Sequence, residues 1–346
     1  MTNPKAVLGW DIGGVNTKVT RLQLAPEKPV CRSVSLPYEV QREPGALGQV
    51  LAAAARDVGA EATDWHAVTM TAELSQAFRT KREGVGFVLD ALEAEFPGVV
   101  IQVYTVQEQF VTAAEARARP LMVAASNWAA TAAWIARTVP SCILVDIGTT
   151  STDLIPIVGG KVEAQGHTDP ERLLSGELVY SGVLRTPAEA VTPQVPLWGG
   201  QAGVSADGFA LIGDAHLWRG HLRPEDYTCR APDGRPATRN FAGERLARVV
   251  CADREMLEDA DIDDIAGALA QAQQDVIAGA LARLRRRWPE IDTAVVAGLG
   301  DFVAADAARA AGLKVLPLAE LLGPAARTAP AATVAWLLWQ SREVTA

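Results

Sequence analysis

The chain has 346 residues, of which 49% are apolar, and it carries a formal net charge of −9. This length favours two domains, because a single hydrophobic core stops growing at about 250–300 residues. The acidic balance argues against nucleic acids and membrane surfaces as partners, since phosphate-rich partners need a basic footprint. We therefore expect small-molecule partners.

Cysteine usage and the lack of targeting patterns indicate the cytoplasm. The cysteines form no Cys-x-x-Cys pair, which argues against a disulfide framework and against a zinc knuckle. They are Cys31, Cys142, Cys229 and Cys251. Residues 1–5 show no basic-then-apolar signal, and no apolar run approaches the roughly 20 residues of a membrane span. We expect a cytoplasmic monomer or homodimer that has no membrane partner.

The first half of the chain alternates predicted strands and helices. An apolar run at 7–10 leads through a glycine turn into 18–24, where polar and apolar residues interleave, as in strand, turn, strand. Helices and strands then alternate as far as Pro140. The predicted helices are 44–58, 84–96 and 124–139, and the predicted strands are 66–71 and 99–104.

The second half opens with the same pattern. Strands are predicted at 142–145 and 154–158, again on either side of a glycine turn. A Pro-, Gly- and Trp-rich insertion follows at about 181–240, with helices expected at 205–217 and, just beyond, 241–251. The remaining predicted elements are a long helix at 262–288, strands at 293–296 and 313–318, and a closing helix at 333–340. We predict two domains, 1–140 and 141–346.

A short motif occurs once at the start of each half. Asp11-Ile12-Gly13-Gly14 superposes on Asp146-Ile147-Gly148-Thr149, which lies 135 residues later. The next four residues superpose in turn: Val15 on Thr150, Asn16 on Ser151, Thr17 on Thr152 and Lys18 on Asp153. A lone Asp-x-Gly-Gly turn is common in ordinary hairpins, but a second copy indicates a duplicated domain.

The residue types of these hairpins suit a phosphate group. Glycine lets a ligand oxygen approach backbone N–H groups, and Asn, Ser and Thr add short donors. The candidate phosphate-binding residues are Gly13, Gly14, Asn16, Thr17, Gly148, Thr149, Thr150 and Ser151. Asp11 and Asp146 are candidates to hold a hydrated Mg²⁺ beside the phosphate and to act in catalysis. Lys18 is a candidate point charge on phosphate, the alternative being an exposed strand lysine.

Other phosphate-binding motifs are excluded by pattern. The Walker signature is absent, and Rossmann glycines open a helix, whereas these glycines link two strands. The combination resembles the actin, sugar-kinase and heat-shock-chaperone superfamily, which implies an α/β fold of two duplicated ribonuclease-H-like domains with a cleft between them. Gly298 and Gly300 follow a buried strand, where that superfamily's nucleotide loop would lie. A plain strand-to-helix turn is an equal alternative for these two glycines.

Several segments resemble a smaller family within that superfamily, related to hydantoinases and oxoprolinases. They are Thr69-Met70-Thr71-Ala72-Glu73-Leu74, Phe78-Arg79-Thr80-Lys81, Glu83-Gly84-Val85, Ala125-Ser126-Asn127-Trp128, and Arg245-Leu246-Ala247-Arg248 with Asp253. The resemblance implies a transferase of methanofuran or methylofuran biosynthesis. Such an enzyme joins an aminomethylfuranylmethyl diphosphate to the phenol oxygen of a glutamyl-tyramine or tyrosine-type acceptor and releases diphosphate.

The same resemblance leaves a second function open. This alternative is an ATP-dependent kinase or an amidohydrolase of the hydantoinase and oxoprolinase kind. Mg²⁺ is the expected cofactor in both interpretations, and the transferase does not require ATP. In the transferase, the hairpins would hold the leaving diphosphate, and the protein's main task is to stabilise developing negative charge.

The acceptor phenol needs a base, because its ordinary pKa is about 10. Glu73, Asp146 and Asp207 are the candidates, and Glu73 has the alternative role of a favourable first-turn charge on a helix. Arg79 and Lys81 suit contact with the diphosphate or an acceptor carboxylate, the alternative being a solvated helix face. Candidates for contact with the substrate are Arg79, Lys81, Asn127 and Asp207.

Overall fold

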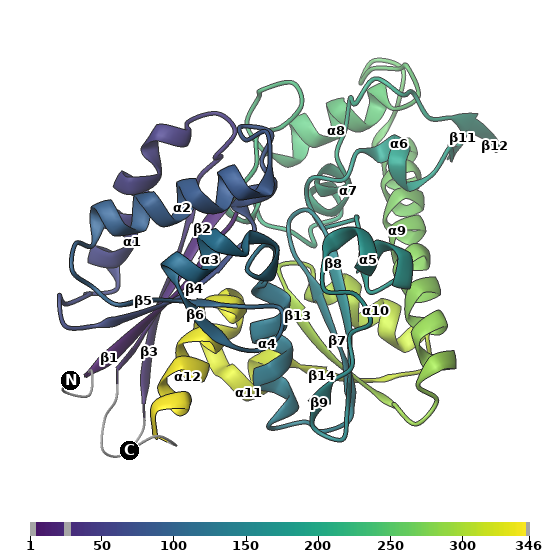
Figure 1. The fold of residues 1–346 in the computed structure, drawn as a ribbon. Helices are drawn as coiled ribbons and strands as arrows, with labels where there is room; N and C mark the ends of the chain where they lie inside the picture. Colours follow the sequence, from purple (N-terminus) through teal and green to yellow (C-terminus); the bar gives the residue numbers. More distant parts are fainter. Residues whose placement is uncertain (1–4, 24–28, 344–346) are drawn as a thin grey trace. The chain divides into compact units, whose positions relative to one another are not determined.

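The structure, a computed structural model, describes residues 5–23 and 29–343 (Figure 1). Residue contacts divide the chain into two compact units. The first unit consists of residues 1–144, 155–175 and 318–346, and the second of 145–154 and 176–317. The predicted boundary at residue 140 separates the two copies of the duplicated domain, which is a different division from these contact units. That boundary stays a prediction. Leu24, the predicted end of the second strand, lies outside the described residues.

The first unit is built on a six-stranded sheet with the order β3-β2-β1-β4-β5-β6. β1 pairs antiparallel with β2 and parallel with β4, so the end of β1 lies between the start of β2 and the end of β4. The strands are β1 Ala6–Ile12, β2 Asn16–Gln23, β3 Val30–Pro37, β4 Trp65–Met70, β5 Ile101–Tyr104 and β6 Phe110–Thr112.

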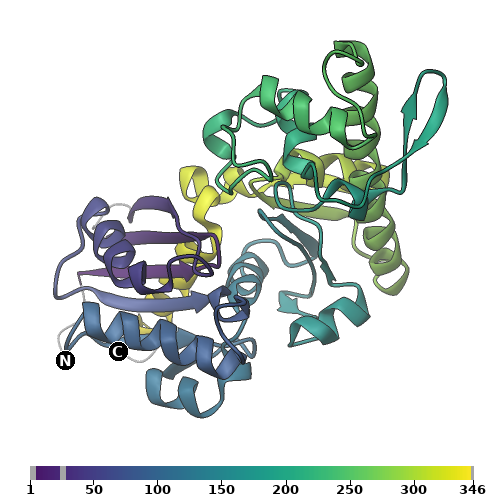
Figure 2. The same ribbon diagram turned by 90° about the horizontal axis from the view of Figure 1, so that it is seen from above.

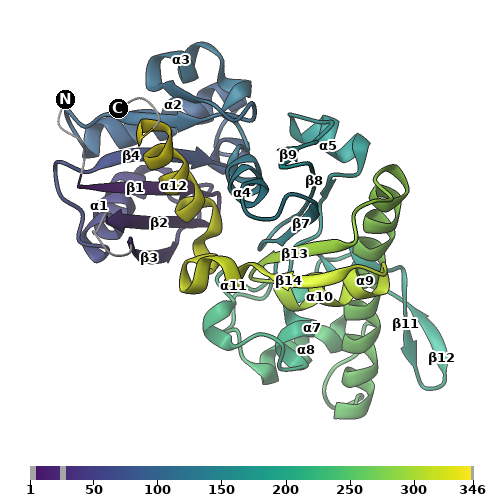
Figure 3. The same cartoon turned by 90° about the horizontal axis from the view of Figure 1, so that it is seen from below.

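Helices cover both faces of this sheet. On one face, α1 Leu47–Asp57, α2 Lys81–Glu95 and α3 Ala113–Ala118 contribute to one apolar core with β1 and β4. On the other face, α12 Ala329–Glu343 packs on β1, β2 and β4, beside α4 Asn127–Ala136 (Figure 3). A Cβ at Gly9 would lie 1.9 Å from the backbone oxygen of Ala331, so glycine in β1 allows α12 to pack this closely.

The second sheet repeats the strand order of the first. Its order is β10-β8-β7-β13-β14, with β9 paired to β8, so β7 occupies the place of β1 and β13 the place of β4. The strands are β7 Cys142–Ile147, β8 Thr152–Val158, β9 Lys161–Val162, β10 Leu178–Val179, β13 Thr293–Gly298 and β14 Lys314–Pro317. This repetition is the structural counterpart of the duplicated sequence motif.

The predicted insertion forms a core of its own against the long helix α9 Asp259–Arg287. It contains α6 Ala188–Val191, α7 Ile212–Trp218 and a hairpin of β11 Gln194–Leu197 and β12 Gly200–Gly203, which projects from the second unit (Figure 2). The next helix, α8 Arg239–Arg248, packs into the same core. Trp218 is buried there and stacks with the guanidinium of Arg239, 3.7 Å from ring centroid to Cζ. The remaining helices are α5 Asp169–Ser175, α10 Asp301–Ala310 and α11 Leu318–Leu322.

Several predicted helix boundaries are wrong by three residues or more, and two of them have a clear local cause. The helix predicted at 205–217 begins at Ile212, because Gly208 has φ +66° and Leu211 is extended. The helix predicted from Gly84 begins three residues earlier, at Lys81. The Thr80 side chain accepts a hydrogen bond from the N–H of Glu83, so Thr80 is the N-cap of α2. A Thr followed three residues later by Glu is a helix-start pattern that the sequence shows directly. Within residues 5–23 and 29–343, no helix combines the length and apolar character that crossing a bilayer requires.

The first turn of α2 presses directly on the segment that carries Glu73. A Cβ at Gly84 would lie 2.5 Å from Cα of Glu73, whereas a Cβ at Gly86 would meet nothing within 4 Å. We expect Gly84→Ala to lower the free energy of unfolding by about 1–3 kcal/mol through overpacking. Gly86→Ala, the matched control, should raise it by about 0.5–1 kcal/mol, because alanine favours the helix. Urea unfolding of both variants tests this, and equal effects would contradict the packing.

Candidate active site

Asp11 lies near the end of β1, and its carboxylate is buried. Lys18 stands opposite it in the antiparallel register with β2, and Nζ lies 3.3 Å from Oδ2 of Asp11. The other oxygen, Oδ1, has no hydrogen-bond partner among the described residues. Lys18 therefore balances the charge of Asp11 while one buried carboxylate oxygen stays available to a ligand.

The turn after Asp11 exposes backbone donors. The N–H of Gly13 closes the turn onto the oxygen of Asn16, and the carbonyls of Gly14 and Val15 accept hydrogen bonds from Val40 and Tyr38. Among the described residues, the N–H groups of Gly14 and Val15 find no backbone acceptor. A Cβ at Gly14 would meet nothing within 4 Å. Occupied carbonyls and unpaired N–H groups make this turn suited to an anion.

The turn after Asp146 has the same arrangement within the second unit. The N–H of Gly148 donates to the oxygen of Ser151, and the carbonyls of Gly148 and Thr149 accept hydrogen bonds from the N–H groups of residues 183–185. In the part of the chain that is described, the N–H groups of Thr149 and Thr150 have no backbone acceptor. Each of the two hairpins therefore presents a pair of adjacent N–H donors.

Residues 181–186 brace this second turn, a role that sequence reasoning missed. Thr152 Oγ1 donates to the oxygen of Ser181 at 2.6 Å, and a Cβ at Gly182 would lie 2.4 Å from the nitrogen of Thr150. Gln273 of α9 donates through Nε2 to the oxygen of Gly182 at 2.9 Å, and its Oε1 lies 2.8 Å from Nε2 of His216. The start of the insertion thus holds the hairpin in shape, and nothing local in the sequence signals this.

Gly298 and Gly300 pack against the strand that carries Asp146. A Cβ at Gly298, where φ is +88°, would lie 2.2 Å from the oxygen of Ile147 and 2.4 Å from Oδ1 of Asp146. The N–H of Gly300 donates to the same Ile147 oxygen at 3.0 Å. The need for glycine at both positions therefore follows from close packing inside the second unit, and nucleotide contact stays a prediction.

We expect Gly298→Ala to cost about 2–5 kcal/mol of stability, because it combines an unfavourable φ with a backbone clash. Gly159→Ala is the control. Gly159 has φ +60°, but a Cβ there would meet nothing within 4 Å, so only the conformational cost of about 1–2 kcal/mol applies. Thermal and denaturant unfolding measure the difference. Similar losses in the two variants would show that the contact with Ile147 and Asp146 is unimportant.

Glu73 lies in a short 3-10 turn, Ala72–Leu74, directly after β4. An isolated parallel bridge joins Met70 to Ala124, which brings the segment that precedes α4 beside this turn. The Glu73 side chain has no exposed surface, and neither carboxylate oxygen has a hydrogen-bond partner among the residues described. Ser126 is equally buried, and its Oγ also lacks a hydrogen-bond partner in the described part of the chain. Two of the family-like segments thus meet around buried polar atoms.

A lysine and a second carboxylate accompany Glu73. Nζ of Lys81 lies 3.9 Å from Oε1 of Glu73 and donates to Oδ2 of Asp169 at 2.6 Å. Burial raises the pKa of Glu73 to about 7, and the Lys81 ammonium opposes that rise. Glu73 is a first-turn residue of its short 3-10 helix, as the alternative expectation had it, and its role as a base stays a prediction. Asp169, which belongs to α5, was not predicted from the sequence.

The other predicted substrate-binding residues have less distinctive environments. Arg79 is exposed, and its backbone N–H donates to Glu83. Asn127 is half-buried at the start of α4, where its carbonyl accepts from Thr131 Oγ1. Asp207 is exposed, and its carboxylate contacts Ser205 Oγ within the same loop. Their contact with substrate stays a prediction.

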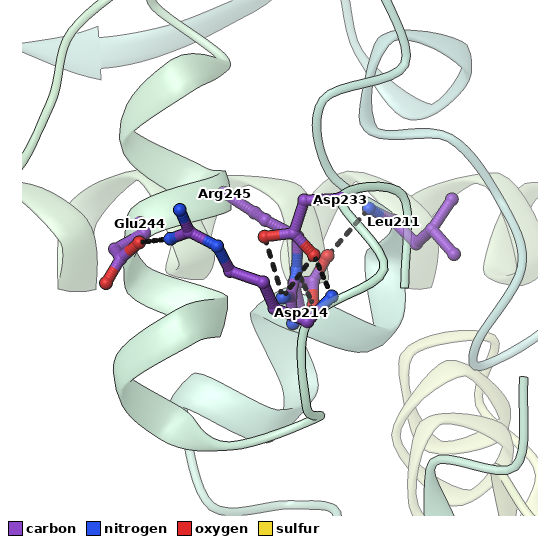
Figure 4. A network of polar contacts seen from close by, with 6 residues as sticks. Leu211, Asp214, Asp233, Glu244 and Arg245 are labelled. Atoms are coloured by element: carbon purple, nitrogen blue, oxygen red, sulfur yellow. Dashed lines mark hydrogen bonds and ion pairs between the residues drawn. The ribbon is translucent and has the colours of Figure 1, made fainter. Parts of the chain in front are cut away.

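Arg245, another residue of the family-like segments, is buried together with Asp214 and belongs to an ionic network that extends to the more exposed Asp233 (Figure 4). Its guanidinium donates to Asp214 Oδ1 through Nε at 2.9 Å and Nη2 at 2.7 Å, and to Asp233 through Nη1 at 3.1 Å. Asp214 also accepts a hydrogen bond from the N–H of Leu211. Because Arg245 finds both of its carboxylate partners, Asp214 and Asp233, in the insertion, we assign this network a structural role.

The described residues hold no group of three or more His, Cys, Asp or Glu side chains placed to bind a metal ion. Mg²⁺ differs from metals that need such a group, because it keeps several waters and uses one or two carboxylates together with substrate phosphates. The buried Oδ1 of Asp11, which has no hydrogen-bond partner within residues 5–23 and 29–343, fits that mode of binding. Asp146 stands at the matching position of the second hairpin.

Comparison with known proteins identifies relatives over most of the chain. The profile of the hydantoinase/oxoprolinase family matches residues 64–340. A Methanocaldococcus jannaschii protein is 36% identical over 302 residues, covering 87% of this chain and 88% of that protein. It is named (4-{4-[2-(gamma-L-glutamylamino)ethyl]phenoxymethyl}furan-2-yl)methanamine synthase. A Methanococcus vannielii protein of the same name is 35% identical over 167 residues, covering 48% of this chain and 74% of that protein.

Solved structures share the fold at low sequence identity. Acetone carboxylase, in its nucleotide-free structure, is 11% identical with a TM-score of 0.56, covering 96% of this chain and 70% of that chain. The activator of 2-hydroxyisocaproyl-CoA dehydratase from Clostridium difficile, with bound ADPNP, is 11% identical with a TM-score of 0.50, covering 98% and 96%. The predicted actin-like ATPase fold is confirmed. The family profile and the relatives together show that this chain belongs to the hydantoinase/oxoprolinase family.

Proposed function

We propose that this protein forms the aryl ether bond between a furanylmethyl group and the phenol oxygen of a glutamyl-tyramine or tyrosine-type acceptor. The observation that carries the proposal is the relative that is 36% identical over 87% of the chain, whose name describes a phenoxymethyl-furan product with a free methanamine. The two hairpins with unpaired N–H donors support a phosphate-bearing substrate. The donor is therefore an aminomethylfuranylmethyl diphosphate.

The reaction exchanges one carbon–oxygen bond for another. The bond between the furanylmethyl carbon and the diphosphate breaks, and the diphosphate leaves with the electron pair. The phenol oxygen forms the new bond to that carbon and gives up its proton to a base. Because the furan ring stabilises positive charge on the reacting carbon, the protein contributes most by stabilising the negative charge that develops on diphosphate.

The hairpins supply donors for this charge. The N–H groups of Gly14 and Val15 in the first, and of Thr149 and Thr150 in the second, have no backbone acceptors among the described residues. Donors fixed by the fold need no reorganisation during the reaction, which is the basis of oxyanion-type stabilisation. Mg²⁺ on Asp11 and Asp146 would supply further neutralisation of the leaving group.

Glu73 is the base that we favour among the three predicted candidates. It is fully buried, both of its oxygens are unpartnered among the described residues, and its pKa of about 7 lies close to neutral pH. Asp207 is exposed. Asp146 stands beside the phosphate-binding turn, where we propose that it binds Mg²⁺ and is therefore not free to accept the proton. Proton transfer from the phenol to Glu73 also relieves the cost of its buried negative charge.

The test is a diphosphate-release assay with purified protein, Mg²⁺ and the aminomethylfuranylmethyl diphosphate. We expect release that depends on the phenolic acceptor and forms one ether product per diphosphate, with no ATP added. An acceptor that has methoxy in place of phenol hydroxyl is the control and should give no product. A strict requirement for ATP would instead support the ATP-dependent kinase or amidohydrolase alternative.

A further inference from the structure

The position of Lys81 in α2 is one where a lysine does not stabilise the helix. It is the first residue of α2, and a cation at a helix N-terminus opposes the helix dipole. Its ammonium instead lies between two carboxylates from different elements, 2.6 Å from Asp169 Oδ2 and 3.9 Å from Glu73 Oε1. The position of Lys81 is therefore explained by the carboxylates that it contacts.

The two carboxylates are not equivalent. Asp169 and Lys81 keep 15% and 21% of their side-chain surface exposed, whereas Glu73 has none. The shorter contact goes to the more exposed carboxylate, so most of the ammonium's charge is engaged by Asp169. The ammonium interacts more weakly with Glu73, because the distance is longer. The environment of Glu73 otherwise disfavours its charged form.

On the basis of the proposed function, we propose that Lys81 and Asp169 are positioning residues for Glu73. Together they set the fraction of Glu73 that is ionised and so available as the base for the acceptor phenol. Lys81 favours the ionised carboxylate, and Asp169 limits that effect by holding Lys81 at hydrogen-bonding distance. Glu73 therefore forms no permanent salt bridge with Lys81 and is not permanently protonated, so it can act as a buried base.

The charged groups around Glu73 give the sign of each change. Lys81 faces it from α2 and lowers its pKa, whereas Asp169 faces it from α5 and raises it. Removing the lysine charge should therefore raise the pKa of Glu73. Removing the Asp169 charge should lower it, because one anion is lost and Lys81 is free to pair with Glu73.

The experiment compares pH profiles of kcat/KM for wild type, Lys81→Met and Asp169→Asn. Activity should rise with pH as Glu73 loses its proton, with an acid limb near 7 in the wild type. We expect the midpoint of the acid limb to rise by about one pH unit or more in Lys81→Met and to fall in Asp169→Asn. Lys81→Arg keeps the charge and should leave the limb near its wild-type position.

A matched control removes a lysine from an ion pair of the same length elsewhere. Lys314 donates to Asp292 at 2.6 Å on an exposed surface, so Lys314→Met should leave the profile unchanged. Acid limbs that coincide in wild type, Lys81→Met and Asp169→Asn would overturn the proposal, and so would limbs that move in the same direction.

A second readout does not depend on turnover. Infrared titration of the protonated carboxyl, assigned by its loss in Glu73→Gln, follows Glu73 directly in each variant. Opposite displacements in Lys81→Met and Asp169→Asn support the coupling even if the wild type releases no diphosphate, in which case the proposed function alone fails. Turnover with an unshifted Glu73 titration would instead overturn the coupling and leave the proposed function standing.

Discussion

Replacing Glu73 by Gln is expected to lower kcat by about 10²–10⁴-fold, the usual contribution of a positioned general base. The amide keeps the size of the side chain but cannot accept the phenol proton at neutral pH. The acid limb of the pH profile near 7 should disappear in the residual activity. Steady-state kinetics with a saturating acceptor measure both effects.

Asp207→Asn serves as the control for this prediction, because Asp207 was the competing candidate from sequence and is exposed. It should retain nearly wild-type kcat. A Glu73→Gln enzyme with wild-type kcat would exclude Glu73 as the base.

The same substitution should make the protein more stable above neutral pH. The folded-state pKa of Glu73 is raised from 4.5 to about 7, so the native state binds a proton that the unfolded chain releases. The stability of the wild type should therefore fall as pH rises from about 4.5 to 7, by on the order of 3 kcal/mol. Glu73→Gln should lack this fall, and unfolding at pH 5 and pH 8 tests the sign. Lost activity with gained stability is typical of a functional site.

Asp11→Asn and Asp146→Asn are each expected to lower kcat on the order of 10²–10³-fold, as the loss of electrostatic stabilisation of a leaving group does. Both carboxylates stand just before a turn that we propose to bind phosphate, where they would suit a hydrated Mg²⁺. The amount of Mg²⁺ needed for half-maximal rate should rise in both variants. Mg²⁺ titrations of diphosphate release provide the measurement.

The duplicated motif also predicts that both aspartates act on the same substrate molecule. A double-mutant cycle on kcat should then show strong non-additivity, because the second substitution removes an interaction that the first has already weakened. Asp292→Asn, on an exposed surface, is the control and should keep its rate and Mg²⁺ dependence. Independent, additive losses would contradict a shared role.

Much of the fold was readable from the sequence because the duplicated hairpins are local features. Asp11 and Asp146 follow apolar runs and precede a glycine by two residues, so their places near the ends of β1 and β7 follow from strand periodicity alone. The same locality explains the predicted long helix, whose apolar stripe continues for many turns. The predicted helix at 205–217 failed where Gly208 and an extended Leu211 interrupt it.

The cluster of Glu73, Lys81 and Asp169 could be predicted from the sequence only in part. The sequence places Glu73 and Lys81 eight residues apart, but Asp169 comes 88 residues after Lys81 and looks like an ordinary first-turn acid of a short helix. Its contact with Lys81 depends on tertiary packing, which no local pattern encodes. The same holds for Gln273, which reaches residues 181 and 182 from the middle of α9.

Gly298 illustrates a pattern that was recognised but had two physical explanations. A glycine after a buried strand suits either ligand contact or close packing, and sequence alone weighs them equally. The contacts with Ile147 and Asp146 account for the glycine without a ligand. Gly14 is the opposite case, because a side chain there would meet no protein atom.

Calorimetric titration of the protein with diphosphate in the presence of Mg²⁺ tests the phosphate-binding role of the hairpins most directly. Gly14→Ala adds a methyl group beside the unpaired N–H donors without touching the protein, and Gly86→Ala adds one within α2, where a Cβ likewise meets nothing within 4 Å. We predict binding by the wild type and by Gly86→Ala, and an affinity at least about tenfold lower in Gly14→Ala, which corresponds to about 1.4 kcal/mol. No binding by the wild type, or equal affinities in all three proteins, would contradict the account.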